Sequence, residues 1–271
     1  YRMLGSAQDA EDLVQETFLR YQATPPETIR SLKAYLTTII SRLCVDQLQL
    51  ARRKRELYVG PWLPEPIPTS AAAEAADPEQ RAQVQESVSL AFLVVLEQLQ
   101  PFERAVFLLR EVFAYEFAEI ATILGKSEVA CRRSFSRARH HLRAQRPRFP
   151  VSPDDHRRLL GEYFQAVQTG EMAPLLDLLA DNVTLWADGG GQARAAVLRP
   201  IRGRSAVARL SLGIRRFWPA DYQGAIENVN GQAALVMRAD GHTWAVLTIA
   251  VEEGRIQAIW IVANPEKLAR V

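Results

Sequence analysis

Two proline-rich stretches divide this chain and limit where helices can run. The first, residues 58–80, holds Gly60 and five prolines, and the second holds three prolines within residues 147–153. Proline fixes φ and lacks an amide donor, so neither stretch supports an extended helix. A length of 271 residues also favours two or three separate cores. We therefore predict linkers at 58–80 and 148–153, which separate segments 1–57, 81–147 and 154–271.

The first two segments are predicted to be all-α. Leu13, Val14, Phe18 and Tyr21 recur at helical spacing, a second helical stretch covers about 31–57, and helical periodicity resumes over 81–142. Segment 154–271 mixes two helices with strand patterns and a further helix near Ser205–Phe217, which indicates an α+β domain. The expected strands are Val183–Ala187, Tyr222–Val229, Ala233–Arg238, Thr243–Glu252 and Arg255–Val262, with Asn230-Gly231, Asp240-Gly241 and Glu253-Gly254 as tight turns.

Positive charge is concentrated at two places in the first half of the chain. Residues 126–148 carry eight basic side chains against one acid, and Arg52 to Arg55 are four basic residues in a row. Segment 151–271 is balanced, with 13 basic and 13 acidic residues. Focused positive charge is typical of a phosphate-binding surface, although a solvated helix end explains either cluster alone equally well.

Composition narrows the class of protein further. Hydrophobic residues make up 48% of the chain, enough for packed cores and too many for global disorder. Cys44 and Cys131 fall on the apolar faces of predicted helices, and their spacing suggests neither a disulfide framework nor a metal site. Without a signal peptide or a long apolar run, we expect a cytoplasmic protein that does not enter a membrane.

Residues 116–142 form a candidate helix-turn-helix. Gly125 can adopt the left-handed conformation that ends a helix, and Ser127 is a suitable N-cap for the next one. Cys131, Phe135, Ala138 and Leu142 would face the core, which leaves a basic face suited to the DNA major groove. The alternative is a plain helical hairpin with a solvated face; agreement of cap, turn and charge favours DNA binding.

The first helix, by contrast, is acidic. Asp9, Glu11, Asp12, Gln15 and Glu16 crowd its polar face, as in a surface that meets a basic protein partner. On physical grounds alone, an ordinary exposed helix is the simpler interpretation.

Asp9-Ala-Glu-Asp-Leu-Val-Gln-Glu-Thr-Phe-Leu-Arg20 resembles region 2 of extracytoplasmic-function (ECF) sigma factors. The stretch from Ala34 to Arg55 is similar to its continuation, and the helix-turn-helix that ends in Ser136-Arg-Ala-Arg139 resembles region 4. Under this resemblance region 2, at 1–57, lacks the start of its first helix, and 81–147 is region 4. The resemblance implies a non-enzymatic initiation factor that needs no cofactor.

The resemblance also implies partners and the residues that contact them. Core RNA polymerase would be bound through its β′ clamp helices and β flap, and promoter DNA through the −10 and −35 elements. Single-stranded −10 bases are expected around Thr28–Tyr35 and the −35 duplex on the second helix of the helix-turn-helix. The implied residues are Asp12, Gln15 and Glu16 for polymerase; Arg30, Lys33, Tyr35, Arg52, Arg53, Lys54 and Arg55 for −10 DNA; and Ser127, Glu128, Arg132, Arg133, Ser136 and Arg137 for −35 DNA.

Three motifs resemble the SigJ-like subgroup, in which a SnoaL-like domain with a cone-shaped, ketosteroid-isomerase-like fold is fused to the sigma factor. They are Trp62-Leu63-Pro64-Glu65-Pro66, Asp188-Gly189-Gly190-Gly191 and Asn264-Pro265-Glu266-Lys267-Leu268. The chain departs from the pattern at Gln192, where a lysine is expected. The resemblance implies that these motifs are interdomain regulatory residues and that the Trp62–Pro66 motif meets the Asp188–Gly191 motif when the third domain packs between the two sigma domains, which it would then regulate in cis.

Other functions stay open on sequence alone. One alternative is a ligand-gated DNA-binding regulator that acts without polymerase, since the third domain could hold an unidentified small ligand. A cyclase or isomerase is less favoured, because Asp188, Tyr222, Asp240 and His242 form no ordered acid–base pair.

Overall fold

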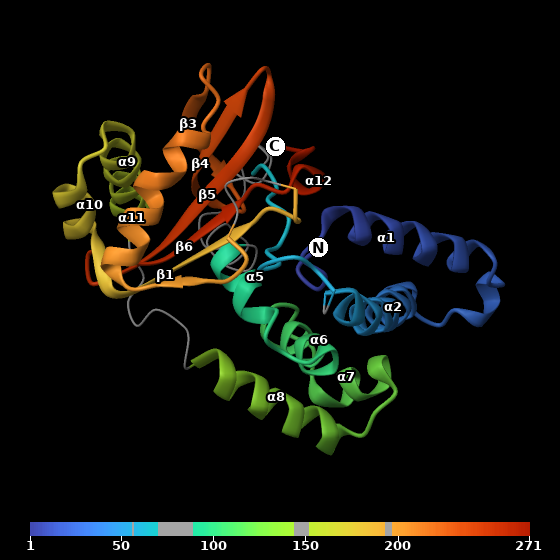
Figure 1. Ribbon diagram of the computed structural model, residues 1–271. Helices are drawn as coiled ribbons and strands as arrows, with labels where there is room; N and C mark the ends of the chain where they lie inside the picture. The colour runs from blue at the N-terminus through green and yellow to red at the C-terminus, as the bar shows by residue number, and fades with distance from the viewer. Residues whose placement is uncertain (56, 70–88, 144–151, 193–196) are drawn as a thin grey trace. The chain divides into compact units, whose positions relative to one another are not determined.

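The computed structural model describes residues 1–55, 57–69, 89–143, 152–192 and 197–271 (Figure 1). The chain divides into two compact units. The helical unit comprises Tyr1–Leu57 and Leu93–Arg146, and the sheet unit comprises Tyr58–Phe92 and Pro147–Val271. Parts of the predicted linkers, residues 70–80 and 148–151, lie outside the described residues.

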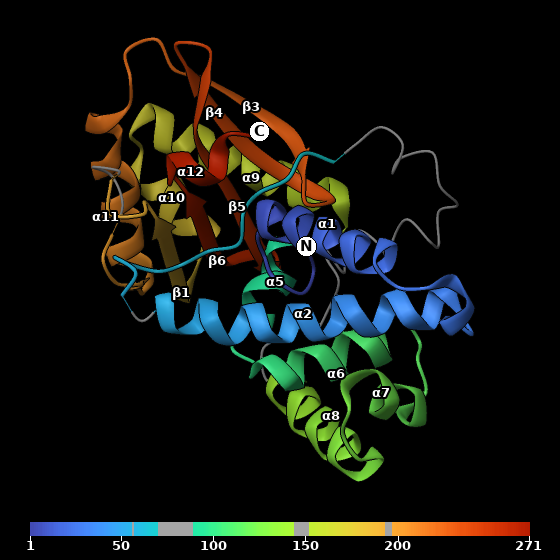
Figure 2. The same cartoon turned by 90° about the vertical axis from the view of Figure 1, so that its right-hand side faces the viewer.

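The helical unit is all-α, as the sequence predicts. Figure 2 shows its longest helix, α2, running along the pair α6 and α7. Helix α5 (Leu90–Leu96) spans the boundary between the two units. The other elements are α1 (Ala7–Gln22), the 3-10 turn η1 (Pro26–Thr28), α2 (Leu32–Arg55), α6 (Pro101–Glu111), α7 (Phe117–Leu124) and α8 (Glu128–Arg143).

Helices α1 and α2 share a small core. Ser6 caps α1 by accepting a hydrogen bond from the amide of Asp9 at 3.2 Å. Leu4, Cys44 and Leu48 are buried, and burial raises the pKa of the Cys44 thiol to about 11. The thiol is therefore protonated and acts as a packing group.

The helix-turn-helix folds as its local signals predict. Gly125 has φ +63° and ends α7, and the Ser127 hydroxyl accepts from the amide of Ala130 at 3.2 Å at the start of α8. Cys131, Ala138 and Leu142 are buried, and Phe135 is partly buried against the same core. Helix α8 thus packs along the predicted stripe and leaves its basic face exposed.

The sheet unit has the predicted α+β architecture. Its six-stranded sheet has the order β2-β1-β6-β5-β4-β3. Strands β3 to β6 form the predicted antiparallel meander, and positive φ at both Asn230 and Gly231 fits the tight turn predicted there. The elements are α9 (Pro153–Thr169), α10 (Met172–Leu178), β1 (Leu179–Asp188), β2 (Ile201–Arg202), α11 (Arg204–Ile214), the 3-10 turn η2 (Arg215–Phe217), β3 (Gln223–Val229), β4 (Gln232–Ala239), β5 (His242–Glu252), β6 (Arg255–Val262) and α12 (Pro265–Leu268).

Helices α9, α10 and α11 lie on one face of this curved sheet (Figure 1). Irregular registers at Met237/Arg238 and at Ala250/Val251 interrupt the ladders, and such bulges bend a sheet. Tyr163 is fully buried between helices and sheet, where its hydroxyl lies 2.7 Å from that of Ser211. The space between the helices and the sheet is therefore filled by a packed core.

Strand β1 pairs in parallel with β6, which the sequence did not indicate. The pairing brings the end of β1, at Asp188, beside the end of β6, at Val262. Helix α12 follows β6 directly, so the Asp188 motif and the Asn264 motif lie together at the ends of these two neighbouring strands.

Candidate promoter-binding surfaces and linker-docking site

The exposed face of α8 carries the predicted −35 residues in two different settings. Arg133 and Ser136 are exposed, and within the described residues no hydrogen bond or ion pair holds their side chains. Arg132 is held: its guanidinium bonds Glu128 at 2.6 Å and lies 4.6 Å from the centre of the Phe117 ring. A guanidinium fixed in this way is oriented before it meets a ligand.

Arg137, also predicted to contact −35 DNA, pairs within the helical unit. Its Nε lies 2.7 Å from Glu103, a buried acid of α6. Arg137 thus ties α8 to α6, a structural contact that the sequence did not indicate. Val129, which the sequence analysis passed over, is 59% exposed at the start of α8, where an apolar side chain can meet a thymine methyl group.

The predicted −10 residues lie at the start and the end of α2. Arg30 and Lys33 are exposed, while the Tyr35 hydroxyl lies 2.6 Å from that of Thr24. Arg52 donates to the side chain of Gln100. Arg53, Lys54 and Arg55 belong to α2, but their side chains lie outside the described part of the structure.

Helix α2 also binds the helix-turn-helix segment within the helical unit. Arg42 donates to the carbonyl oxygens of Ile123 at 2.8 Å and Thr122 at 3.2 Å, both at the end of α7. Lys33 lies 5.6 Å from the centre of the Tyr115 ring. A predicted −10 residue is therefore in contact with the segment that carries the −35 residues.

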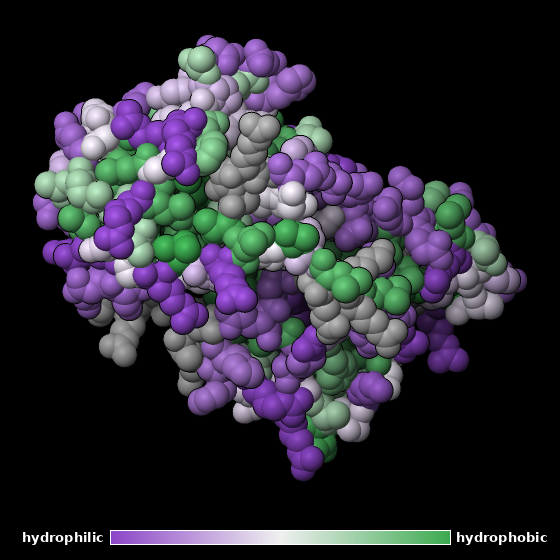
Figure 3. Space-filling model, viewed as in Figure 1, coloured by the Kyte–Doolittle hydropathy of each residue, from purple (hydrophilic) through white to green (hydrophobic). Residues whose placement is uncertain are grey.

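The exposed face of α1 combines acids with apolar side chains. Asp12 and Gln15 are exposed, and Glu16 pairs with Arg20 at 2.7 Å. Val14 and Phe18 belong to the apolar stripe noted in the sequence, yet they are 61% and 55% exposed, and Leu19 is 59% exposed. Hydrophobic side chains interrupt the hydrophilic surface in Figure 3 where α1 lies. Exposed apolar residues beside acids are typical of a protein-binding surface.

Residues Tyr58–Thr69, which we call the docked segment, bind along the sheet unit. The carboxylate of Asp188 is fully buried and is bound from several sides. It accepts from the amide of Leu63 at 2.8 Å and from the hydroxyl of Tyr58 at 2.5 Å, and it pairs with Lys267 at 2.6 Å. We call these residues, with Asn264, the Asp188 cluster.

Lys267 and Asn264 join α12 to the same cluster. The ammonium group of Lys267 also donates to the carbonyl of Leu63 at 2.5 Å and lies 4.0 Å from the centre of the Trp62 ring. Asn264 donates to the Tyr58 hydroxyl at 2.9 Å. Burial and the hydrogen bond to Asp188 raise the pKa of Tyr58 above its ordinary value, so its hydroxyl keeps its proton.

The glycines after Asp188 allow the side chain of Asn264 to come close to the backbone of this loop. At Gly190, φ is +59° and a Cβ would lie 2.6 Å from the Asn264 side chain, so a larger residue would be strained and would clash. Gln192, where a lysine was expected, is exposed. The cation that pairs with Asp188 is Lys267, and the sequence did not predict this ion pair.

The far end of the docked segment extends the β3–β4 hairpin. The amide of Thr69 donates to the carbonyl of Asn228 at 2.9 Å, and the amide of Asn230 donates to the carbonyl of Ile67 at 2.8 Å. Glu65 is buried and lies 3.5 Å from Arg270. The structure thus brings together all three predicted interdomain motifs within the sheet unit.

No helix among the described residues is long and apolar enough to cross a membrane. In the same residues, no group of three His, Cys, Asp or Glu side chains could hold a metal ion. His242 is exposed, and positive φ places Asp240 in its turn.

The two helical segments match known families. Residues 1–55 match the model of sigma-70 region 2, and residues 89–142 match that of sigma-70 region 4. Together they define a transcription initiation factor that recognises promoters, a class of non-enzymatic proteins.

This chain belongs to the ECF RNA polymerase sigma factor family. It is 37% identical to the ECF RNA polymerase sigma factor SigJ of Mycobacterium tuberculosis, over 98% of this chain and 88% of the relative. SigI of the same species, named a probable ECF RNA polymerase sigma factor, is 32% identical over 99% and 89%. The crystal structure of SigJ superposes with a TM-score of 0.75 at 36% identity, over 98% of this chain and 92% of that one.

The Asp188 cluster predicts a specific effect of removing one charge. Asp188→Asn keeps the shape of the side chain but removes the buried negative charge that pairs with Lys267, which is expected to destabilise by about 3 kcal/mol. We expect this loss in the free energy of unfolding, together with faster hydrogen exchange at the amide of Leu63.

Asp181→Asn is the matched control, since Asp181 pairs with Arg204 at 2.7 Å but is 91% exposed. For Asp181→Asn, the free energy of unfolding is expected to fall by less than about 1 kcal/mol. Equal effects of the two substitutions, or unchanged exchange at Leu63, would contradict the assignment.

Proposed function

We propose that this sigma factor binds core polymerase through α1, reads the two promoter elements with α2 and α8, and is regulated in cis by its sheet unit. The proposal of regulation in cis rests on the Asp188 cluster. This cluster holds the docked segment, which is part of the connection between region 2 and region 4, on the sheet unit.

The −35 proposal rests on charge and exposure along α8. Ser127, Glu128, Arg132, Arg133 and Ser136 lie at its start or on its exposed face, the part of a recognition helix that reaches base edges. Arginine donates two hydrogen bonds to guanine in the major groove, and glutamate accepts one from cytosine. Arg132 and Glu128 carry this chemistry side by side, whereas Arg137 would first have to leave Glu103.

The −10 proposal places melted DNA against the start of α2. Arg30 and Lys33 would neutralise phosphates there, and the Tyr35 ring would offer a stacking surface for an unpaired base. The run from Arg52 to Arg55 adds positive charge at the other end of the helix. Because Lys33 lies on the Tyr115 ring, DNA at this site would compete with that contact.

The polymerase proposal assigns α1 to the β′ clamp helices. Asp12, Gln15 and Glu16 supply the polar contacts, while Val14, Phe18 and Leu19 supply exposed apolar area that a partner can bury. The β flap is assigned to region 4.

Regulation follows from where the docked segment is held. A tethered domain acts on its neighbours at high effective concentration, so a fused regulator needs no separate inhibitor. Asp188 belongs to β1, whereas Asn264 is the N-cap of α12 and Lys267 lies within that helix. Our proposal is a dual regulator: the domain as a whole supports activity, and the terminal segment restrains it by holding the docked segment.

The −35 assignment predicts a change in salt dependence. Arg132→Ala with Arg133→Ala removes two cations from the DNA surface, so fewer counterions are released on binding. We expect weaker binding to a −35 duplex and a slope of log affinity against log salt that falls by about 1 to 2. A fluorescence anisotropy titration at several salt concentrations measures both.

Arg157→Ala with Arg158→Ala, on the exposed surface of α9, is the charge-matched control. It should leave the slope unchanged. A slope that does not change in the α8 variant, or that changes equally in both, would refute the assignment of α8.

Two truncations test the regulatory proposal in opposite directions. Deletion from Asn264 onward removes Lys267 and releases the docked segment, so transcription with core polymerase should rise. Deletion from Asp154 onward removes the α+β domain, so transcription should fall below that of the full chain. Promoter transcription in a reconstituted assay measures both, and two truncations that match the full chain would overturn the proposal.

A further inference from the structure

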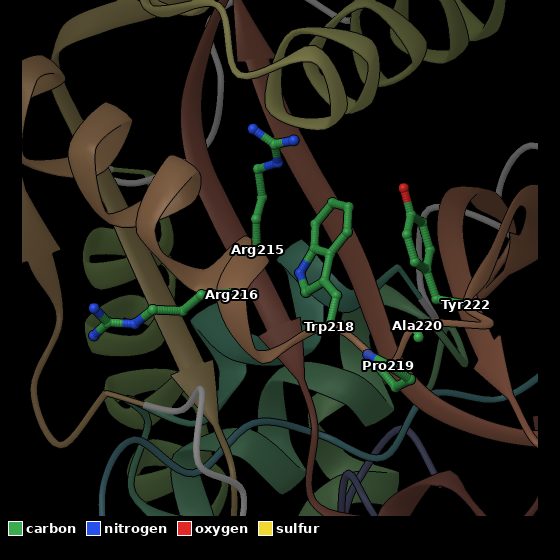
Figure 4. Close-up of a pocket in the computed structure, with 6 residues that line it drawn as sticks. All are labelled: Arg215, Arg216, Trp218, Pro219, Ala220 and Tyr222. Carbon is green, nitrogen blue, oxygen red and sulfur yellow. The ribbon is translucent and has the colours of Figure 1, made fainter.

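A groove lies on the rim of the sheet unit, away from the Asp188 cluster. It is formed by η2 and the turn that leads to β3, is shallow and widely open to solvent, and has a volume of about 390 Å³ (Figure 4). This size lies within the usual range for small-molecule sites. Its lining residues are Arg215, Arg216, Trp218, Pro219, Ala220 and Tyr222.

The groove is distinct from the interior between helices and sheet. Fully buried side chains, among them Leu160, Tyr163 and Leu175, fill that interior.

One wall of the groove consists of aromatic side chains that pack against other residues of the sheet unit. The Trp218 ring meets Tyr222 edge to face, with ring centres 4.8 Å apart, and stacks on Phe164 at 6.1 Å. Gln168 donates to the Tyr222 hydroxyl at 2.9 Å, which fixes that ring. A preorganised aromatic wall favours a flat, apolar ligand, because little side-chain freedom is lost on binding.

The groove also carries positive charge and no acid among its lining residues. Figure 4 shows the Arg215 side chain running alongside Trp218, whereas Arg216 extends away from it. Arg216 lies 4.7 Å from the Phe217 ring, but Arg215 has no carboxylate partner among the described residues. A Cβ at Gly170 would lie 2.4 Å from the Arg215 guanidinium, so this guanidinium is packed closely against the end of α9.

We infer that this groove binds a small aromatic carboxylate. The aromatic ring of the ligand lies against Trp218, and its carboxylate accepts hydrogen bonds from the Arg215 guanidinium. The planar guanidinium fork matches a carboxylate with two parallel bonds. The inference goes beyond the proposed function, because it adds a small-molecule ligand that binds the sheet unit.

Calorimetry on the full chain tests the inference with 1-naphthoate as the probe. The neutral analogue 1-naphthalenemethanol has the same ring system without the charge. We expect naphthoate to bind and the alcohol to bind at least about tenfold more weakly, because the alcohol cannot make the charge-assisted hydrogen bonds to Arg215. Neither DNA nor polymerase takes part, so failure here is distinguishable from failure of the sigma-factor proposal.

Variants locate the site. Arg215→Gln should weaken naphthoate binding at least about tenfold and remove the preference over the alcohol. Trp218→Leu should weaken both probes, with circular dichroism as the check on folding. Arg209→Gln, an exposed arginine of α11 outside the groove, is the charge-matched control and should change affinity less than twofold. Equal binding of the two probes, unchanged binding by Arg215→Gln, or no binding of naphthoate would overturn the inference.

Discussion

The buried carboxylate of Asp188 determines how the docked segment is held. A charge that leaves water carries a desolvation cost of several kcal/mol, and only a full set of partners offsets it. Asp188 has such a set in Tyr58, Leu63, Gly190 and Lys267, with bonds of 2.5 to 3.1 Å. Because these partners come from the docked segment, from the loop after β1 and from α12, one charge fixes three parts of the chain together.

Local signals predicted much of the fold. Gly125 and Ser127 marked the helix-turn-helix, and turn dipeptides such as Asn230-Gly231 marked the meander, because caps and turns depend on a few neighbouring residues. The motifs of the cluster were recognised by resemblance, which also implied that the Trp62 motif meets the Asp188 motif. The ion pair of Asp188 with Lys267 was not predicted, because it depends on the parallel pairing of β1 with β6. The exposure of Val14 and Phe18 likewise depends on which face α2 covers, which helical spacing alone does not reveal.

Contacts in each unit bear on the proposed regulation. In the helical unit, Arg42 of α2 donates to the end of α7 and Lys33 lies on the Tyr115 ring, so α2 is packed against the segment that leads into α8. In the sheet unit, the Asp188 cluster holds the segment that joins the same two regions. On our proposal, release of the docked segment raises activity. A ligand at the Arg215 groove would act on the unit that holds this segment.

The most direct test of the account is run-off transcription by the full-length protein with purified core polymerase. The account predicts a transcript with one defined start, which Asp12→Ala with Gln15→Ala abolishes while binding to a −35 duplex persists. A protein that binds the duplex but supports no transcript with core polymerase would contradict it. That result would point instead to a DNA-binding regulator that acts without polymerase.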